Sequence, residues 1–386
     1  MPITLRLGLY YATIFAGTGV SLPYIAVWFR AQGLNGAQIG AILSAPMLAR
    51  VLTGPALGLW ADGFRLRRTP MALLGAAAAA GYAALGFMHG FWAWFVAWFV
   101  GATAIAALTP LADVVAIRRA RLDGFVYGLP RGVGSTAYVL ANLTMGLLLT
   151  RWPPQIVLWW IVVLAVLTIA AARVLLPPDP VHDGARVGGR DRLRGMGGLL
   201  RDRTFLLAAV SAGLIQAGHA FYYGFSTLIW KAQGLSAALI GMLWAVGVAA
   251  EVAFMWFMEP WRRRLGPARL LALGGLGAVV RWTALGLSPP VALLVPLQGL
   301  HMFSFTSTYM ASLQMMERLA PPQSASAAQT FSSALSTGLL IGIATLASGP
   351  LFDAVGAAGY FAMAATAGCG LAGALILVRR PASELA

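Results

Sequence analysis

Apolar runs of about 20 residues recur along the whole chain, and they restrict the fold more than any other feature. Hydrophobic residues make up 59% of the sequence and charged residues only 10%, far from the averages of water-soluble proteins. A run of this length crosses the hydrocarbon core of a bilayer as a helix, which satisfies its own backbone hydrogen bonds. The sequence therefore predicts an all-α integral membrane protein.

Twelve membrane-spanning helices are predicted, with both chain termini in the cytoplasm. Their ranges are 5–29, 35–61, 70–89, 91–117, 130–151, 155–176, 204–230, 236–258, 267–287, 290–317, 324–352 and 355–378. Of the 27 basic residues, 21 fall in one set of loops and only Arg30, Arg151 and Lys231 in the opposite set. Because cytoplasmic loops are enriched in Lys and Arg, the sequence predicts cytoplasmic termini and a location in a bacterial inner membrane.

An internal repeat divides the chain into two halves. The segment RAQGLNGAQIGAIL from Arg30 recurs as KAQGLSAALIGML from Lys231, at a constant offset of 201 residues. Each copy joins the first and second predicted helices of its half, and residues 177–203 between the halves are rich in Pro, Gly and charges. We therefore predict two pseudo-symmetric six-helix bundles, 1–176 and 204–386, joined by a cytoplasmic linker over 177–203.

Five charged residues lie inside apolar runs, which makes them candidate functional groups. They are Arg50, Arg131, Arg281, Asp113 and Glu251. A guanidinium at bilayer depth costs about 2.5 kcal/mol or more, so it normally faces protein or water. Burial favours the neutral form of a carboxylate, as a proton carrier requires. The groups either bind a polar solute and a proton or form fixed structural ion pairs.

Two predicted helices place polar and aromatic side chains on one face. One face holds Gln216, His219 and Tyr223, and another holds Gln298, His301, Ser304 and Phe305. Such faces either contact a solute or are packed and hydrogen-bonded in the protein interior. The aromatic residues Tyr10, Tyr11, Tyr24 and Trp28 have two similar interpretations, stacking on a solute or anchoring at the membrane interface.

The loop after the second predicted helix carries a family resemblance. It reads GLWADGFRLRR from Gly58 to Arg68 and resembles the signature loop of the major facilitator superfamily. The resemblance implies twelve helices around a central cavity lined by helices 1, 4, 7 and 10. It also implies a cytoplasmic gate formed by Asp62, Arg67 and Arg68, in which Asp62 pairs with one of the two arginines.

Within that superfamily, the chain resembles the phenylpropionate-permease-like branch, which is related to lactose permease and to oligosaccharide and nucleoside proton symporters. Asp113 and Arg131, 18 residues apart, match the acid–arginine pair that binds sugar in lactose permease. Arg281 and His301 match its helix 9 arginine and helix 10 histidine. Lactose permease has a proton-carrying carboxylate where Ser304 stands here, so Glu251, Asp113 or His301 has to carry the proton.

Together these features predict a secondary active transporter that couples uptake of a small aromatic carboxylate to a proton. Arg131 is expected to contact the carboxylate, and Glu251 or Asp113 to carry the proton, with Arg50 and Arg281 in an interior charge network. The predicted solute-binding residues are Arg131, Asp113, His219, Tyr223, Gln216, Gln298, His301 and Phe305.

Other functions remain open on the sequence alone. The alternatives are symport of a sugar or nucleoside, efflux of a drug, a receptor that does not transport, or a membrane-embedded enzyme. No nucleotide-binding or hydrolytic motif and no cysteine-based metal motif is visible. We expect a monomeric transporter in the lipid bilayer, without enzymatic activity, cofactor, metal ion or nucleic acid. The solute, the direction of transport and the proton stoichiometry are left open.

Overall fold

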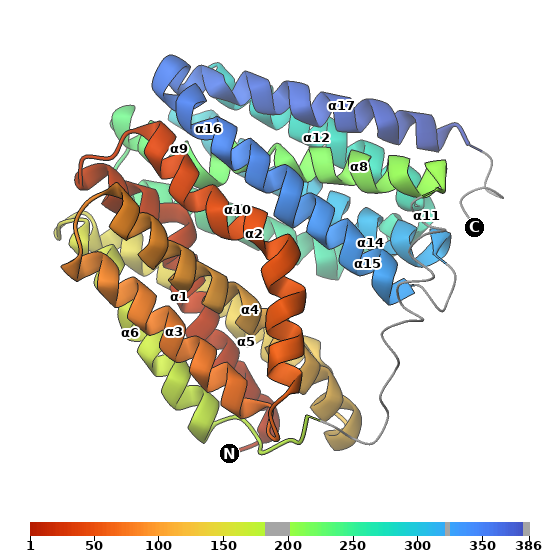
Figure 1. Ribbon diagram of the computed structural model, residues 1–386. Coiled ribbons are helices and arrows are strands. Elements are labelled where there is room, and N and C mark those ends of the chain that lie inside the picture. Colours follow the sequence, from red (N-terminus) through yellow and green to blue (C-terminus); the bar gives the residue numbers. More distant parts are fainter. Residues whose placement is uncertain (182–200, 321–324, 381–386) are drawn as a thin grey trace. The chain divides into compact units, whose positions relative to one another are not determined.

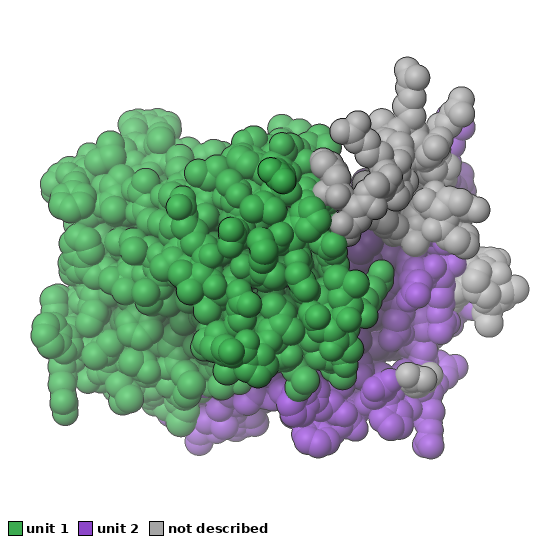
Figure 2. Space-filling view, turned by 90° about the horizontal axis from the view of Figure 1, so that it is seen from below, with its two compact units in different colours: residues 1–186, 230–242 green, residues 187–229, 243–386 purple. Residues whose placement is uncertain are grey.

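The computed structural model describes residues 1–181, 201–320 and 325–380, and the regular elements in these ranges are helices (Figure 1). The chain divides into two compact units. Unit 1 holds residues 1–186 and 230–242, and unit 2 holds residues 187–229 and 243–386 (Figure 2). Residues 230–242, predicted in the second bundle, thus cluster with unit 1. Residues 182–200 of the predicted linker lie outside the described residues.

Unit 1 is a bundle of six long helices. They are α1 (Ile3–Ala31), α2 (Gly36–Asp62), α3 (Arg68–Phe87), α4 (Phe91–Asp123), α5 (Gly128–Leu148) and α6 (Gln155–Val174). Helix α1 packs against α5 and α6, and α3 packs against α4 and α6. At Gly19 a Cβ atom would lie 2.5 Å from the Tyr138 carbonyl oxygen, so glycine is what allows α1 and α5 to approach this closely.

The helices of the second half are shorter and less regular, and residues 230–242, which end one of them and begin the next, belong to unit 1. In order they are α8 (Arg203–Ala217), α9 (Ala220–Ala232), α10 (Ala237–Phe257), α11 (Glu259–Leu265), α12 (Pro267–Gly286), α13 (Val291–Gly299), the π-helix η1 (Met302–Ser307), α14 (Thr308–Leu319), α15 (Ala325–Ser333), the π-helix η3 (Ala334–Leu340), α16 (Ile341–Val355), the 3-10 helix η4 (Gly356–Gly359) and α17 (Tyr360–Val378). Helices α8, α12 and α17 lie side by side (Figure 1).

The structure interrupts three of the predicted helices. The one over 204–230 breaks at Gly218 and His219, where both the backbone N–H and the ring Nδ1 of His219 bond to the Gln216 carbonyl oxygen. The ones over 290–317 and 324–352 each contain a π-helical segment. Nine helical segments among the described residues are long and apolar enough to cross a membrane. The count of twelve spans therefore remains a prediction.

The repeated sequence forms the same local structure in both halves. Gly33 and Gly234, 201 residues apart, end α1 and α9 with φ of 88° and 85°, a region that glycine enters without steric cost. The following helices both begin with a side-chain cap. Asn35 accepts a hydrogen bond from the Gln38 N–H (2.9 Å), and Ser236 accepts one from the Leu239 N–H (3.3 Å). The internal repeat is thus a repeated helix–turn–helix junction.

Candidate functional site

Basic segments of unit 1 meet at one end of its bundle. Arg6 near the start of α1 donates to the Val174 carbonyl oxygen at the end of α6 (3.4 Å), and Arg68 at the start of α3 donates to the Arg173 carbonyl oxygen (3.5 Å). Loops that the charge pattern assigned to one side of the membrane therefore lie together in space.

The predicted pairing within the signature loop is wrong for the described residues. Arg67 does not bind Asp62, but donates to the Val181 carbonyl oxygen (2.7 Å), while Asp62 is exposed without a bond to either arginine. The Arg67 N–H also bonds to the Asp179 carbonyl oxygen, and the Val181 N–H to the Arg65 carbonyl oxygen. The loop thus pairs with the chain that follows α6, because short antiparallel backbone pairing satisfies groups on both segments.

Asp179 anchors that chain to α4. Its carboxylate is only 2% exposed and accepts two hydrogen bonds from Arg119, the one from Nε being 2.9 Å long. The Nη1 of Arg118 lies 3.9 Å from the same carboxylate. We call residues 179–181 the 179–181 segment. This segment follows α6, and it bonds both to the end of α4 and to the loop between α2 and α3.

The Asp113 cluster consists of Tyr11, Asp113, Tyr127 and Arg131 and lies in unit 1. Arg131 Nη1 is 2.9 Å from Asp113 Oδ1, so these two charges form an ion pair. The hydroxyls of Tyr11 and Tyr127 donate to the same oxygen at 2.6 and 2.8 Å. The side chains of Arg131 and Asp113 are 35% and 28% exposed, so the pair is open to water or to a solute.

Aromatic rings support the guanidinium of Arg131. Its central carbon lies 4.8 Å from the centre of the Phe15 ring and 5.5 Å from that of Tyr11, within the range of a cation–π contact. Gly134, one turn after Arg131, makes this possible. A Cβ atom there would lie 2.9 Å from the Cβ of Tyr11 and 3.0 Å from Phe15. The close approach of α1 and α5 therefore brings aromatic rings to a cation.

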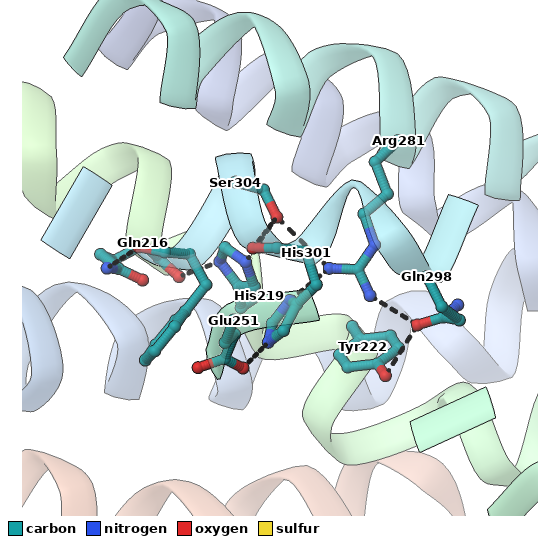
Figure 3. A network of polar contacts seen from close by, with 9 residues as sticks. Gln216, His219, Tyr222, Glu251, Arg281, Gln298, His301 and Ser304 are labelled. Atoms are coloured by element: carbon teal, nitrogen blue, oxygen red, sulfur yellow. Dashed lines mark hydrogen bonds and ion pairs between the residues drawn. The ribbon is translucent and has the colours of Figure 1, made fainter. Parts of the chain in front are cut away.

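The second polar group, in unit 2, is a buried hydrogen-bonded chain that we call the His301 network (Figure 3). Its members are His219, Tyr222, Glu251, Arg281, Gln298, His301 and Ser304. His301 lies between Glu251, whose Oε1 is 2.9 Å from Nε2, and Arg281, whose Nη1 is 2.5 Å from Nδ1. Arg281 Nη2 donates to Gln298 Oε1 (2.7 Å), which also accepts from Tyr222 (3.0 Å).

The bonding pattern fixes the proton positions on both histidines. A guanidinium nitrogen only donates, so His301 Nδ1 accepts from Arg281, and the ring proton sits on Nε2 and points to Glu251. The Gln216 carbonyl oxygen only accepts, so His219 carries its proton on Nδ1 (3.1 Å) and accepts from Ser304 on Nε2 (3.2 Å). His301 is therefore neutral in this arrangement, and Glu251, the carboxylate to which it donates, is the acidic member of the His301 network.

Only part of the His301 network can be reached from outside. Arg281, His219 and Gln298 have relative exposures of 0%, so the predicted binding residues His219 and Gln298 lie behind others. The Glu251 side chain is 16% exposed, and Tyr223 and Phe305 are partly exposed. Gln216 supports this face, because its amide donates to the Phe305 carbonyl oxygen in η1 (3.3 Å).

The remaining predicted residues differ in whether they are exposed or packed in the protein interior. Arg50 is exposed on α2, and no hydrogen bond or ion pair with another described residue is found, whereas Arg281 belongs to the His301 network. Tyr24 and Trp28 are buried in the packing of unit 1, where they donate to Asn142 and Gln155. They therefore pack in the interior and do not stack on a solute.

Sequence reasoning missed several residues of the two polar groups. They are Phe15, Tyr127, Tyr222 and Trp282, the last of which lies 4.5 Å from the Arg281 guanidinium carbon. Aromatic residues are common in apolar runs, so nothing marked Phe15, Tyr222 and Trp282. The spacing of Tyr127 and Arg131, one helical turn apart, was the available signal. No group of three or more His, Cys, Asp or Glu residues able to hold a metal ion occurs among the described residues.

Comparisons with known proteins agree with this geometry. The chain is 30% identical to the probable 3-phenylpropionic acid transporter of Escherichia coli (strain K12) over 94% of both chains. It is also 30% identical to the maltose permease of Geobacillus stearothermophilus, over 89% of this chain and 86% of the permease. The solved structure of the nucleoside transporter NupG has the same fold, with a TM-score of 0.86 at 16% identity, covering 99% of this chain and 100% of that one.

A family model agrees with these relatives. The model of the MFS_1 like family matches residues 4–363. This chain therefore belongs to the MFS_1 like family of major facilitator superfamily transporters and is a multi-pass membrane transporter, not an enzyme.

Proposed function

We propose that this protein is a proton-coupled symporter of a small aromatic carboxylate that works by alternating access. The proposal is carried by the guanidinium of Arg131. It is 35% exposed, and only one of its nitrogens is bonded to Asp113. A guanidinium edge binds a carboxylate through two parallel hydrogen bonds. The ring of Phe15 beside it, which is partly exposed, suits an aromatic body.

The relatives support the same class of solute. One of the proteins at 30% identity is described as a probable 3-phenylpropionic acid transporter, and 3-phenylpropionate is a phenyl ring joined to a carboxylate. In unit 2, Tyr223 and Phe305 are the partly exposed members of the predicted solute-binding set. His219 stacks on Tyr223, His301 stacks on Phe305, and Gln216 bonds to the Phe305 carbonyl oxygen, while Gln298 bonds to Tyr222 and Arg281.

Proton coupling is assigned to the carboxylates that remain partly exposed. Glu251 is the carrier in this scheme, because its neighbour His301 is held neutral by Arg281. Asp113 is the alternative carrier, with 28% of its side chain exposed. We place the protein in a bacterial inner membrane as a monomer with cytoplasmic termini, and Asp62, Arg67 and Arg68 at its cytoplasmic gate.

Symport of a neutral sugar is the second candidate. It is favoured by the maltose permease, which is as similar in sequence as the 3-phenylpropionic acid transporter. In that case Asp113 and Arg131 would together bind hydroxyl groups of the solute. The arrangement of three donors on one oxygen of Asp113 leaves the second oxygen open for such a bond.

Flux through the purified protein in liposomes distinguishes these candidates. With an inward proton gradient, 3-phenylpropionate is expected to accumulate, and a pH-sensitive dye inside the liposomes is expected to report acidification beyond that of empty liposomes. Maltose serves as the alternative solute. Accumulation of maltose without 3-phenylpropionate would select the sugar candidate, and tight binding without flux would indicate a receptor.

A further inference from the structure

The hydrogen bonds to Asp113 are distributed unevenly between its two oxygens. Oδ1 accepts from Tyr11 (2.6 Å), Tyr127 (2.8 Å) and Arg131 (2.9 Å). No described residue donates to Oδ2. Helices α2 and α3 also pack against α4, but no charged or titratable group on them bonds to Asp113. One oxygen is saturated, and the other is open to a proton.

The guanidinium of Arg131 is also only partly used. Nη1 binds Asp113, while Nη2 and Nε have no hydrogen-bond partner among the described residues. A solute carboxylate that accepts two hydrogen bonds from this guanidinium binds it more strongly than Asp113, which accepts one. A second anion beside Asp113 would, however, leave the cluster with an unbalanced negative charge, which is costly away from bulk water.

We propose that the solute carboxylate displaces Asp113 from Arg131 and that Asp113 takes up a proton on Oδ2 in the same step. Before binding, the charges of Arg131 and Asp113 cancel. After binding, the charges of Arg131 and the solute cancel, and Asp113 is neutral. One proton and one carboxylate therefore enter the site without a change in its net charge. This inference rests on the proposed carboxylate solute, and it adds a proton step at binding that does not involve Glu251.

Tyr11 and Tyr127 act as positioning residues in this exchange. Their hydroxyls continue to donate to Oδ1 after Arg131 has left, so Asp113 stays in place instead of following the guanidinium. Both hydroxyls stabilise the charged carboxylate more than the neutral one. They therefore set the pH at which the exchange takes place. Binding and protonation are linked reciprocally, because each changes the free energy of the other by the same amount.

The test is calorimetric titration of the purified full-length protein at neutral pH in two buffers of different ionisation enthalpy. Binding of 3-phenylpropionate is expected to take up one proton per solute, in wild type and equally in Glu251→Gln. The neutral analogue 3-phenylpropionamide is expected to bind without proton uptake. Asp113→Asn is expected to bind 3-phenylpropionate with no proton uptake and with an affinity independent of pH.

Single-hydroxyl variants test the positioning role. Tyr127→Phe is expected to raise the pH at which affinity is half-maximal by about half a unit or more, because the charged carboxylate loses a donor. Tyr10→Phe is the matched control. It removes a buried hydroxyl on the same helix as Tyr11 that has no partner among the described residues, so the midpoint should not move.

Two outcomes overturn the inference while the proposed function stands. One is proton-free binding of 3-phenylpropionate to a wild type that still takes it up together with protons in liposomes. The other is full proton uptake on binding in Asp113→Asn. Equal midpoints in Tyr127→Phe and Tyr10→Phe would overturn the positioning role. A protein that binds maltose but not 3-phenylpropionate would overturn the proposed function itself, and the exchange with it.

Discussion

Arg281 donates a hydrogen bond to His301 across 2.5 Å and so prevents that imidazole from becoming charged. A protonated ring would place a second N–H against a guanidinium that has no acceptor to offer. The arginine is completely buried, and its guanidinium carbon lies 4.5 Å from the ring centres of Tyr222 and Trp282. His301 is thus held in one tautomer by a group that cannot leave, and it presents a fixed donor to Glu251.

Replacing Arg281 is therefore expected to destabilise the fold. Arg281→Met leaves His301 Nδ1 without a donor, which costs about 1–3 kcal/mol for a buried acceptor, and it removes one of the two donors to Gln298 Oε1. Arg50→Met is the matched control, because Arg50 is exposed and bonds to no described residue. Thermal unfolding in detergent should show a clearly lower midpoint for Arg281→Met alone. Equal shifts in both variants would contradict the assigned role of Arg281.

Glu251→Gln is expected to weaken the coupling of transport to the proton gradient. The amide keeps an oxygen to accept from His301 Nε2, so the network stays bonded, but the side chain no longer exchanges a proton. Concentrative uptake into liposomes should fall below the wild-type level, because only the proton taken up at Asp113 remains, while exchange of labelled for unlabelled solute continues. Concentrative uptake that survives unchanged in Glu251→Gln but is abolished in Asp113→Asn would move the proton carrier to Asp113.

Asp179 and Asp123 offer a matched comparison, since both carboxylates pair with Arg119. Asp179 is 2% exposed and doubly bonded, whereas Asp123 is 36% exposed with its Oδ2 3.7 Å from Arg119. Asp179→Ala should lower the free energy of unfolding by about 1–3 kcal/mol, because it leaves charged donors without an acceptor. Asp123→Ala should cost about 0.5 kcal/mol or less. Chemical denaturation followed by tryptophan fluorescence measures both, and a larger loss for Asp123→Ala would count against this assignment.

Because the two junctions have the same local structure, we predict that replacing the equivalent glycine in either one lowers the free energy of unfolding by the same amount. In Gly33→Ala and Gly234→Ala the new side chain must adopt φ near 88° and 85°, which costs about 1–2 kcal/mol. Gly132→Ala is the control, since a Cβ there meets nothing within 4 Å and its φ is not in the left-handed region. The midpoint temperature of thermal unfolding should be lowered by a similar amount in Gly33→Ala and Gly234→Ala and should not be lowered in Gly132→Ala. A normal midpoint in either would show that the junction tolerates another backbone path.

The fold could be predicted largely because lipid permits few backbone structures. Runs of apolar residues located the helices to within a few residues at α2 and α12, and the offset of 201 residues located both junctions. The break at Gly218 and the π-helix η1 could not be predicted. Each depends on tertiary hydrogen bonds, such as the one from Gln216 to the Phe305 carbonyl oxygen, that leave no periodic trace in the sequence.

The candidate site was only partly accessible to sequence reasoning. Asp113 and Arg131 could be paired because charges in apolar runs are rare and need partners. Their neighbour Phe15 could not be assigned, because an aromatic residue in such a run has many possible surroundings. Asp179 lies in a Pro-rich stretch that suggested a linker, and its pairing with Arg119 depends on where the chain turns back after α6.

The 179–181 segment decides where this transporter can be divided into separately expressed halves. A first fragment that stops at residue 176, the end of the last apolar run, would leave Arg118 and Arg119 without Asp179 and the α2–α3 loop without its pairing backbone. A fragment that continues through Val181 keeps both. Split versions of the protein made for complementation or labelling should therefore be cut after that valine, several residues beyond the point that hydropathy suggests.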